Sequence, residues 1–295
     1  MSSERRTLEV QAPDGRMLCV QLAGDPDGVP VVLNPGTPNS RLLFDPWIAD
    51  ARAKGIRLIS YDRPGYGHST RHEGHTVADG ARDIETILDE LGIERFAVWG
   101  FSGGGPYTLA TAGLLPDRVV AAGSVCAIAP WDAPGLDYFT GMGEDNLEEI
   151  KLYFEDPEAS RAKGREQLAA TLAVTPEGMT EAWKTLLSDA DAAVLTGEFA
   201  SYMVDGIRDG LAPGDDGWWD DGVAHLTPWG FAFDSIRVPV KVWHGRQDRF
   251  VPFQHGEWLA ANIPGAQAAL TDDDGHLTLL VNRFTDVHDF LLAHF

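Results

Sequence analysis

The chain has 295 residues with 23 basic and 45 acidic side chains, and its formal net charge of −22 repels nucleic acid backbones and anionic membrane surfaces. We therefore expect neither a nucleic acid nor a membrane among its partners. Hydrophobic residues make up 44% of the chain, enough for one large domain with a sizeable core. Cys19 and Cys126 lie in apolar stretches and predict buried free thiols, and the absence of any long apolar run indicates a cytoplasmic protein.

Strand and helix signals alternate through the first part of the chain. Two stretches of alternating apolar and polar residues flank a turn at 12–15 and predict an antiparallel hairpin. The apolar runs that follow are continuous, which is typical of buried parallel strands. We expect strands at residues 7–10, 16–23, 29–33, 56–61, 96–99 and 119–129, and helices at 45–54, 81–91 and 106–112. This succession of βαβ units predicts a mostly parallel sheet.

The pattern changes between residues 131 and 226. β-branched runs stop there, and apolar residues recur at the spacing of helices around Ile150, Trp183 and Tyr202. We interpret residues 131–226 as a helical insertion that closes with an acidic, glycine-rich loop at 214–222. Its many aromatic side chains are expected to pack between the insertion and the sheet domain, and some of them to line a pocket.

Sheet signals resume after the insertion. We expect strands at 238–243 and 268–270, and helices at 254–262 and 277–295. The predicted organisation is therefore one core domain, made of residues 1–130 and 227–295, with the insertion at 131–226 between its two parts.

A serine lies between the predicted strand 96–99 and the helix 106–112. The segment Gly100-Phe101-Ser102-Gly103-Gly104 matches G-x-S-x-G, in which a serine occupies a sharp strand-to-helix turn and glycines let the two elements approach. Taken alone, the segment also fits a glycine-rich turn with an incidental serine. With its flanking elements, it makes Ser102 the candidate nucleophile.

Two further loops offer an acid and a histidine. Asp248 follows the predicted strand 238–243, and His276 follows the strand 268–270. A serine hydroxyl is a poor nucleophile near neutral pH, so a histidine must take its proton, and a carboxylate holds that histidine in the right tautomer. Asp132, after the strand 119–129, is an alternative acid. The sequence thus predicts a catalytic triad.

The motifs NPGTPNSR, YDRPGYGHS, GFSGGG, HGRQDRFVP and DDGH, with the order serine, aspartate, histidine, resemble those of the α/β-hydrolase superfamily over nearly the whole chain. Within it, the chain is similar to capped esterase and lipase-like hydrolases of bacteria. The resemblance implies an α/β-hydrolase fold, a mostly parallel twisted sheet flanked by helices, with residues 131–226 as a helical cap or lid. It also favours Asp248 over Asp132, since Asp248 lies on a loop before a helix.

The resemblance further implies an oxyanion hole made by two backbone N–H groups, those of Thr37 and Gly103. Many relatives carry His-Gly at the start of the first of these loops, where this chain has Pro35-Gly36. Proline has no N–H, so we expect Thr37 to be the donor, and the geometry of this loop is left open.

The expected function is that of a serine hydrolase with a small-molecule substrate. We expect a small to medium, largely hydrophobic carboxylic ester, thioester or lactone, cleaved through an acyl-serine intermediate with no metal and no organic cofactor. The three histidines at 68, 72 and 75 lack ligand partners at metal spacing, and dinucleotide-type glycine spacing is absent. Amide or carbon–carbon bond hydrolysis, cofactor-free perhydrolysis, and a ligand-binding receptor on the same fold remain alternatives.

Overall fold

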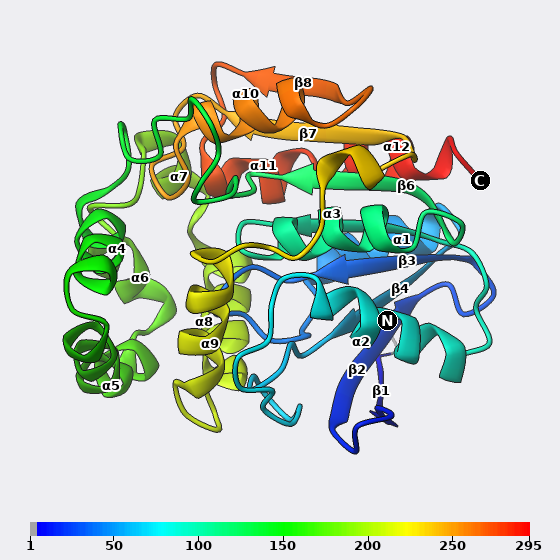
Figure 1. Cartoon of the computed structure of the whole chain (residues 1–295), viewed down its shortest axis with the longest axis horizontal. Helices are drawn as coiled ribbons and strands as arrows, with labels where there is room; N and C mark the ends of the chain where they lie inside the picture. The colour runs from blue at the N-terminus through cyan, green and yellow to red at the C-terminus, as the bar shows by residue number, and fades with distance from the viewer. Residues whose placement is uncertain (1–4) are drawn as a thin grey trace.

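The structure is a computed structural model that describes residues 5–295, and its strands form one sheet (Figure 1). The strands are β1 (Arg6–Gln11), β2 (Met17–Gly24), β3 (Val29–Asn34), β4 (Ile56–Tyr61), β5 (Phe96–Phe101), β6 (Val119–Val125), β7 (Val240–Gly245) and β8 (Gln267–Thr271). They lie in the order β1-β2-β4-β3-β5-β6-β7-β8; β2 runs antiparallel to β1 and β4, and the other neighbours are parallel. This arrangement confirms the predicted fold class.

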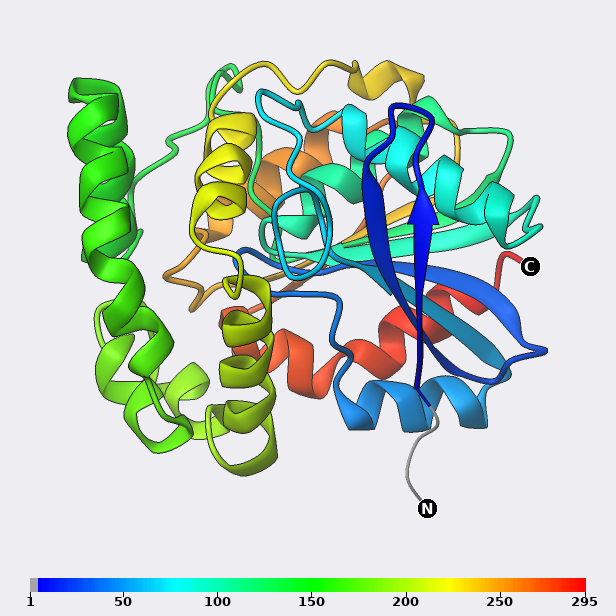
Figure 2. The same cartoon turned by 90° about the horizontal axis from the view of Figure 1, so that it is seen from below.

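Helices cover both faces of this sheet. They are α1 (Asp45–Ala53), α2 (Asp79–Glu90), α3 (Gly104–Leu114), α10 (Phe253–Asn262), α11 (His276–Asn282) and α12 (Phe284–Leu292), with a 3-10 turn at Phe233–Ser235. One apolar layer joins α1, α11 and α12 to the sheet, and the other joins α2, α3 and α10 to it (Figure 2). Because helices pack on both of its faces, β5 is buried along its whole length, which explains its continuous apolar run.

The prediction of a single helix over 277–295 was wrong. The chain forms α11 and α12, and Arg283 between them, with φ −118° and ψ −2°, belongs to neither helix. The guanidinium of Arg283 pairs with Asp274 at 3.0 Å. Both helices bury apolar residues in the same layer, so the apolar spacing continues across the break and conceals it.

The insertion, residues 131–226, is helical, and its helices lie beyond the carboxyl ends of the parallel strands (Figure 1). They are α4 (Glu144–Glu155), α5 (Pro157–Ala173), a 3-10 turn (Pro176–Gly178), α6 (Met179–Ala182), α7 (Asp189–Val194), α8 (Gly197–Gly210) and α9 (Asp216–His225). The first four residues of the predicted core, 1–4, lie outside the described part of the chain. None of the helices described from residue 5 onward combines the length and apolarity needed to cross a membrane.

The predicted acidic loop at 214–222 was also wrong, because most of it belongs to α9. Two of its carboxylates, Asp220 and Asp221, are buried in ion pairs with arginines of the sheet domain. Gly217 lies where a Cβ would meet the backbone of Gly65, so this glycine allows close packing. The acids and glycines that indicated a loop are therefore packing features of a helix.

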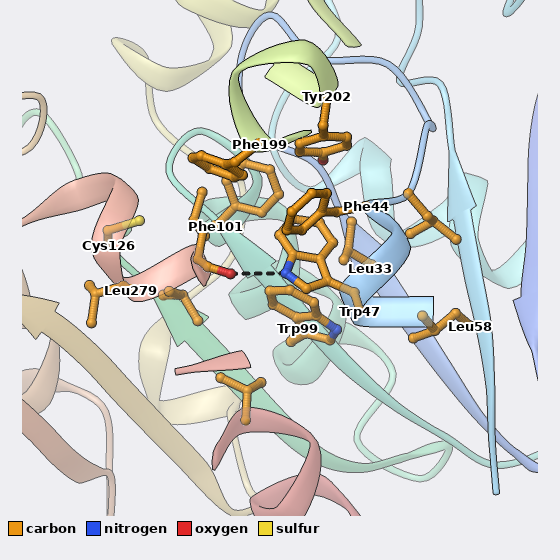
Figure 3. Close-up of a cluster of buried hydrophobic side chains, with 14 of the residues drawn as sticks. Leu33, Phe44, Trp47, Leu58, Trp99, Phe101, Cys126, Phe199, Tyr202 and Leu279 are labelled. Atoms are coloured by element: carbon orange, nitrogen blue, oxygen red, sulfur yellow. Dashed lines mark hydrogen bonds between the residues drawn. The ribbon is translucent and has the colours of Figure 1, made fainter. Parts of the chain in front are cut away.

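A cluster of aromatic side chains connects the sheet domain to the insertion (Figure 3). Trp47 on α1 is fully buried, and its indole N–H donates to the carbonyl of Leu280 at 2.9 Å. Its ring packs edge-on against Trp99 of β5 and against Tyr202 of α8, with centroid distances of 5.3 Å in both pairs. The insertion and the sheet therefore share one core around this tryptophan.

Replacing Trp47 with phenylalanine removes the bond to Leu280 and part of this packing, so we expect a loss of about 1–3 kcal/mol in the free energy of unfolding. Urea titration followed by circular dichroism measures it. Trp258→Phe is the matched control, since its indole also donates to a carbonyl, at Pro134 and 3.1 Å, but the side chain is only half-buried. Equal losses in the two variants would contradict a central role for Trp47.

Candidate active site

Ser102 occupies the turn between β5 and α3. Its φ is 53°, in the left-handed region that non-glycine residues rarely adopt, which is the strained geometry expected of a serine held out from a strand-to-helix turn. A Cβ at Gly100 would meet the carbonyl of Gly104, and one at Gly104 would meet the backbone of Asn34. The glycines around Ser102 are thus required by the close approach of β3, β5 and α3, and the serine side chain stays partly exposed.

The structure brings Asp248 and His276 together. Asp248 Oδ2 lies 2.7 Å from His276 Nδ1, and its other oxygen accepts from the backbone N–H groups of Phe250 and Val251 at 2.9 and 2.8 Å. Both side chains are buried, whereas Asp132, the alternative acid, is exposed. Asp248 is therefore the carboxylate that orients His276.

Burial by itself lowers the pKa of His276, but Asp248 and the thiol of Cys126 outweigh it and hold the pKa well above the ordinary 6.5. The ring of Phe250 stacks on the imidazole at a centroid distance of 4.7 Å. His276 thus lies between a carboxylate that favours its protonated form and an aromatic ring that excludes water.

Cys126 is one residue at this site that the sequence did not single out as functional. It follows β6, is fully buried and has a φ of 40°, and its thiol contributes to the raised pKa of His276. The ligand atoms of Cys126, Asp248 and His276 lie within 4.8 Å of one another, close enough to hold a metal ion. Within this group, Nδ1 of His276 is already paired with Asp248 at 2.7 Å. The one sequence signal that could have placed Cys126 at the site is its position at the carboxyl end of a predicted strand.

Among residues 5–295, no hydrogen bond joins the hydroxyl of Ser102 to His276. The structure therefore pairs the acid with the histidine but leaves the serine apart from them. Catalytic hydrogen bonds are often long before substrate binds, so this separation is compatible with a triad.

Thr37 and Gly103 lie against each other, because a Cβ on Gly103 would collide with the hydroxyl of Thr37. A Cβ on Gly36 would lie 3.2 Å from Cβ of Ser102, so this loop also lies beside the serine. Within residues 5–295, the backbone N–H groups of Thr37 and Gly103 have no acceptor. The carbonyl of Pro35 accepts a hydrogen bond from Arg63, which holds the loop where many relatives carry histidine.

An aspartate of the insertion holds the helix that carries His276. Asp191 on α7 is fully buried and accepts from the backbone N–H groups of His276, Leu277 and Thr278 at 3.0, 2.7 and 3.1 Å. These are the unpaired donors at the start of α11, so Asp191 serves as its N-terminal cap from 85 residues away. No local pattern of residues indicates this contact.

Asp191→Ala leaves three buried N–H groups without a partner, and we expect it to lower the free energy of unfolding by about 2–4 kcal/mol. Guanidinium titration measures the change. Ser188→Ala is the matched control, because it removes only the hydroxyl that donates to Asp191 at 3.0 Å and caps α7, and should cost about 1 kcal/mol. A loss no larger in the aspartate variant than in the serine variant would refute the capping role.

Two cavities lie near this site without reaching Ser102. One lies within the insertion and is lined by Thr171, Val174, Met179, Trp183, Val204 and Ile207. The other is an open depression beside Asp248, at Ser188, Arg249 and Pro252.

Comparison with known proteins agrees with this fold. The chain is 27% identical over 255 residues to the AB hydrolase superfamily protein YisY of Bacillus subtilis, covering 84% of this chain and 85% of that protein. It is 26% identical over 249 residues to the bifunctional esterase/perhydrolase DCH of Acinetobacter calcoaceticus, covering 83% of each. The esterase EaEST from Exiguobacterium antarcticum has the same fold, with a TM-score of 0.68 at 23% identity over 97% of this chain and 100% of that one.

The family model for the alpha/beta hydrolase fold matches residues 29–283, which include every strand from β3 to β8 and the whole insertion. This match covers most of the chain, and the protein therefore belongs to the α/β hydrolase family.

Proposed function

We propose that the protein is a serine hydrolase that cleaves a small to medium, largely hydrophobic carboxylic ester, thioester or lactone through an acyl-serine intermediate. One observation carries the proposal: the 2.7 Å pair of Asp248 and His276 lies at the same edge of the sheet as Ser102 on its strained turn. The family to which the chain belongs supports hydrolase chemistry.

In the proposed mechanism, Asp248 holds the Nδ1 proton of His276, so Nε2 is free to accept a proton from Ser102. The serine oxygen then attacks the carbonyl carbon, and the negative charge on the former carbonyl oxygen is stabilised by the N–H groups of Thr37 and Gly103. His276 gives the proton to the leaving alcohol or thiol. A water molecule, deprotonated by the same histidine, attacks the acyl-serine and releases the acid and the serine.

The preference for a hydrophobic substrate rests on the side chains near the site. Phe101 precedes the serine, Phe250 covers His276, and Trp183 of the insertion packs edge-on against Phe250 at 5.4 Å. Such walls favour apolar acyl or alcohol groups over charged ones. Two of the similar proteins carry esterase in their names, which supports an ester as the first substrate to test.

Perhydrolysis is a second candidate, because the relative from Acinetobacter calcoaceticus is named both esterase and perhydrolase. In that reaction hydrogen peroxide replaces water as the acceptor of the acyl group. Amide and carbon–carbon bond hydrolysis use the same nucleophile, and a ligand-binding receptor would keep the pocket without turnover. Product analysis on an ester, with and without peroxide, separates the first two.

The nucleophile is tested by incubating the protein with a fluorophosphonate and measuring its intact mass. We expect one adduct on the native chain, none on Ser102→Ala, and labelling slowed at least about a hundredfold in His276→Ala, because the general base is lost. Asp248→Asn and Asp132→Asn form a matched pair, of which only the first should slow the labelling. Labelling that survives in Ser102→Ala would exclude this serine as the nucleophile. A native chain that is not labelled would favour the alternative of a ligand-binding receptor.

The raised pKa of His276 predicts the pH dependence of hydrolysis. The imidazole must be neutral to accept a proton, so kcat/KM should rise with pH through a midpoint above 6.5. The thiol of Cys126 contributes to that raised pKa, so Cys126→Ala should move the midpoint to lower pH. Steady-state rates from about pH 5 to pH 10 measure both midpoints. An unchanged midpoint in Cys126→Ala would mean that the thiol has no influence on the imidazole.

A further inference from the structure

Helix α9 of the insertion reaches both residues of the proposed oxyanion hole. Asp221 and His225 are four residues apart, so they project from the same face of this helix. Asp221 contacts Thr37, and His225 contacts Gly103. We propose that α9 positions the oxyanion hole through these two side chains. The inference rests on the proposed function, because it takes Thr37 and Gly103 as the donors.

The first contact is a buried ion pair that encloses the loop of Thr37. Asp221 and Arg63 form a bidentate pair, with Arg63 Nε and Nη2 donating to the two carboxylate oxygens at 3.1 and 2.6 Å. The hydroxyl of Thr37 donates to Asp221 Oδ2 at 2.5 Å and accepts from Arg63 Nη2 at 2.9 Å. Arg63 also donates to the carbonyl of Pro35. Residues on both sides of Gly36 are thus bonded to the same pair.

Further donors hold the carboxylate of this pair. The side chains of Asp221 and Arg63 are 0% and 1% exposed, and the hydroxyls of Tyr66 and Tyr107 donate to the carboxylate at 3.1 and 2.6 Å. Burial by itself raises the pKa of Asp221, but the Arg63 guanidinium holds that pKa well below its ordinary value. The carboxylate therefore stays ionised near neutral pH and keeps these donors in place.

The second contact acts on Gly103. His225 Nε2 lies 2.9 Å from the carbonyl oxygen of Gly103, so this nitrogen carries the proton and donates it. Burial lowers the pKa of His225 and keeps the ring neutral, which gives it a single N–H donor. The ring is also close to Gly103 itself, since a Cβ there would lie 2.9 Å from His225 Cε1. One face of α9 therefore fixes the peptide next to each proposed oxyanion donor.

This arrangement matters because oxyanion donors must be in place before the charge develops. A displacement of about 1 Å in a catalytic group can cost about a hundredfold in rate. Asp221 and His225 do not touch the substrate in the proposed mechanism, so they are positioning residues. The insertion is then part of the catalytic apparatus, and a movement that withdraws α9 would also loosen the oxyanion hole.

The test uses matched pairs of substitutions in the full chain. Thr37→Val removes the hydroxyl but keeps the shape and the backbone N–H, whereas Thr37→Ser keeps the hydroxyl. His225→Leu removes the donor to Gly103, whereas His225→Gln can place an amide N–H at the same position. We expect kcat per titrated active site to fall about ten- to a hundredfold in the valine and leucine variants, with KM changed less than about threefold. The serine and glutamine variants should retain most of the rate.

The chain supplies a control on the same helix. Asp220, next to Asp221, forms its own bidentate pair with Arg71 at 2.6 and 2.9 Å, but this pair does not touch the loop of Thr37. Asp220→Asn and Asp221→Asn should both lower stability, and only the second should lower kcat per active site. Equal falls in kcat would show general destabilisation and overturn the inference, as would wild-type kcat in Thr37→Val and His225→Leu.

A second readout is independent of turnover. Amide hydrogen exchange of peptides covering residues 34–40 should be at least about tenfold faster in Thr37→Val than in Thr37→Ser. If the native chain takes no fluorophosphonate and hydrolyses no ester, the proposed function fails, and exchange alone decides whether α9 orders this loop. Equal exchange in the two threonine variants would overturn the inference even in an active enzyme.

Discussion

The parallel pairing of β3, β5, β6, β7 and β8 is the constraint on which this site depends. It brings the carboxyl ends of strands from distant parts of the chain to one edge of the sheet, so that Ser102, Cys126, Asp248 and His276 follow neighbouring strands. The glycines around Ser102 then let β3 and α3 approach the strand between them. Without this strand order, Ser102 and His276, which are more than a hundred positions apart in the chain, would not lie at the same edge of the sheet.

Side chains of the insertion hold two segments of the candidate active site in place. Asp191 holds the first turn of the helix that starts at His276, and Asp221 holds the loop of Thr37 through Arg63. Both carboxylates are fully buried, and both are satisfied by donors from the sheet domain. Buried charges of this kind cost free energy unless they are fully paired, so they tie the insertion to one orientation on the sheet. The shared aromatic core around Trp47 supports the same orientation with apolar contacts.

The fold and the nearness of Asp248 to His276 could be predicted because their signals are local or follow from parallel strands. Continuous apolar runs mark buried strands, and the motifs stand directly after them. The errors came from tertiary contacts. The segment 214–222 reads as a loop because acids and glycines usually face solvent, yet Asp220 and Asp221 pair with distant arginines and Gly217 packs on Gly65. The break at Arg283 was hidden because α11 and α12 bury the same apolar face.

The sequence by itself determined the class of fold and the turn at Ser102, since both depend on strand periodicity and on residues next to one another in the chain, whereas the family resemblance favoured Asp248 over Asp132 as the acid. Only the tertiary structure decided which side chains hold these groups. Packing between segments that lie far apart in the sequence sets three of these contacts. It places Cys126 near His276, Asp191 at the start of the helix of His276, and Asp221 against Thr37. The partner of a buried charge cannot be read from the sequence, because the free energy of an ion pair depends on distance and desolvation. Both are set only when the chain has folded.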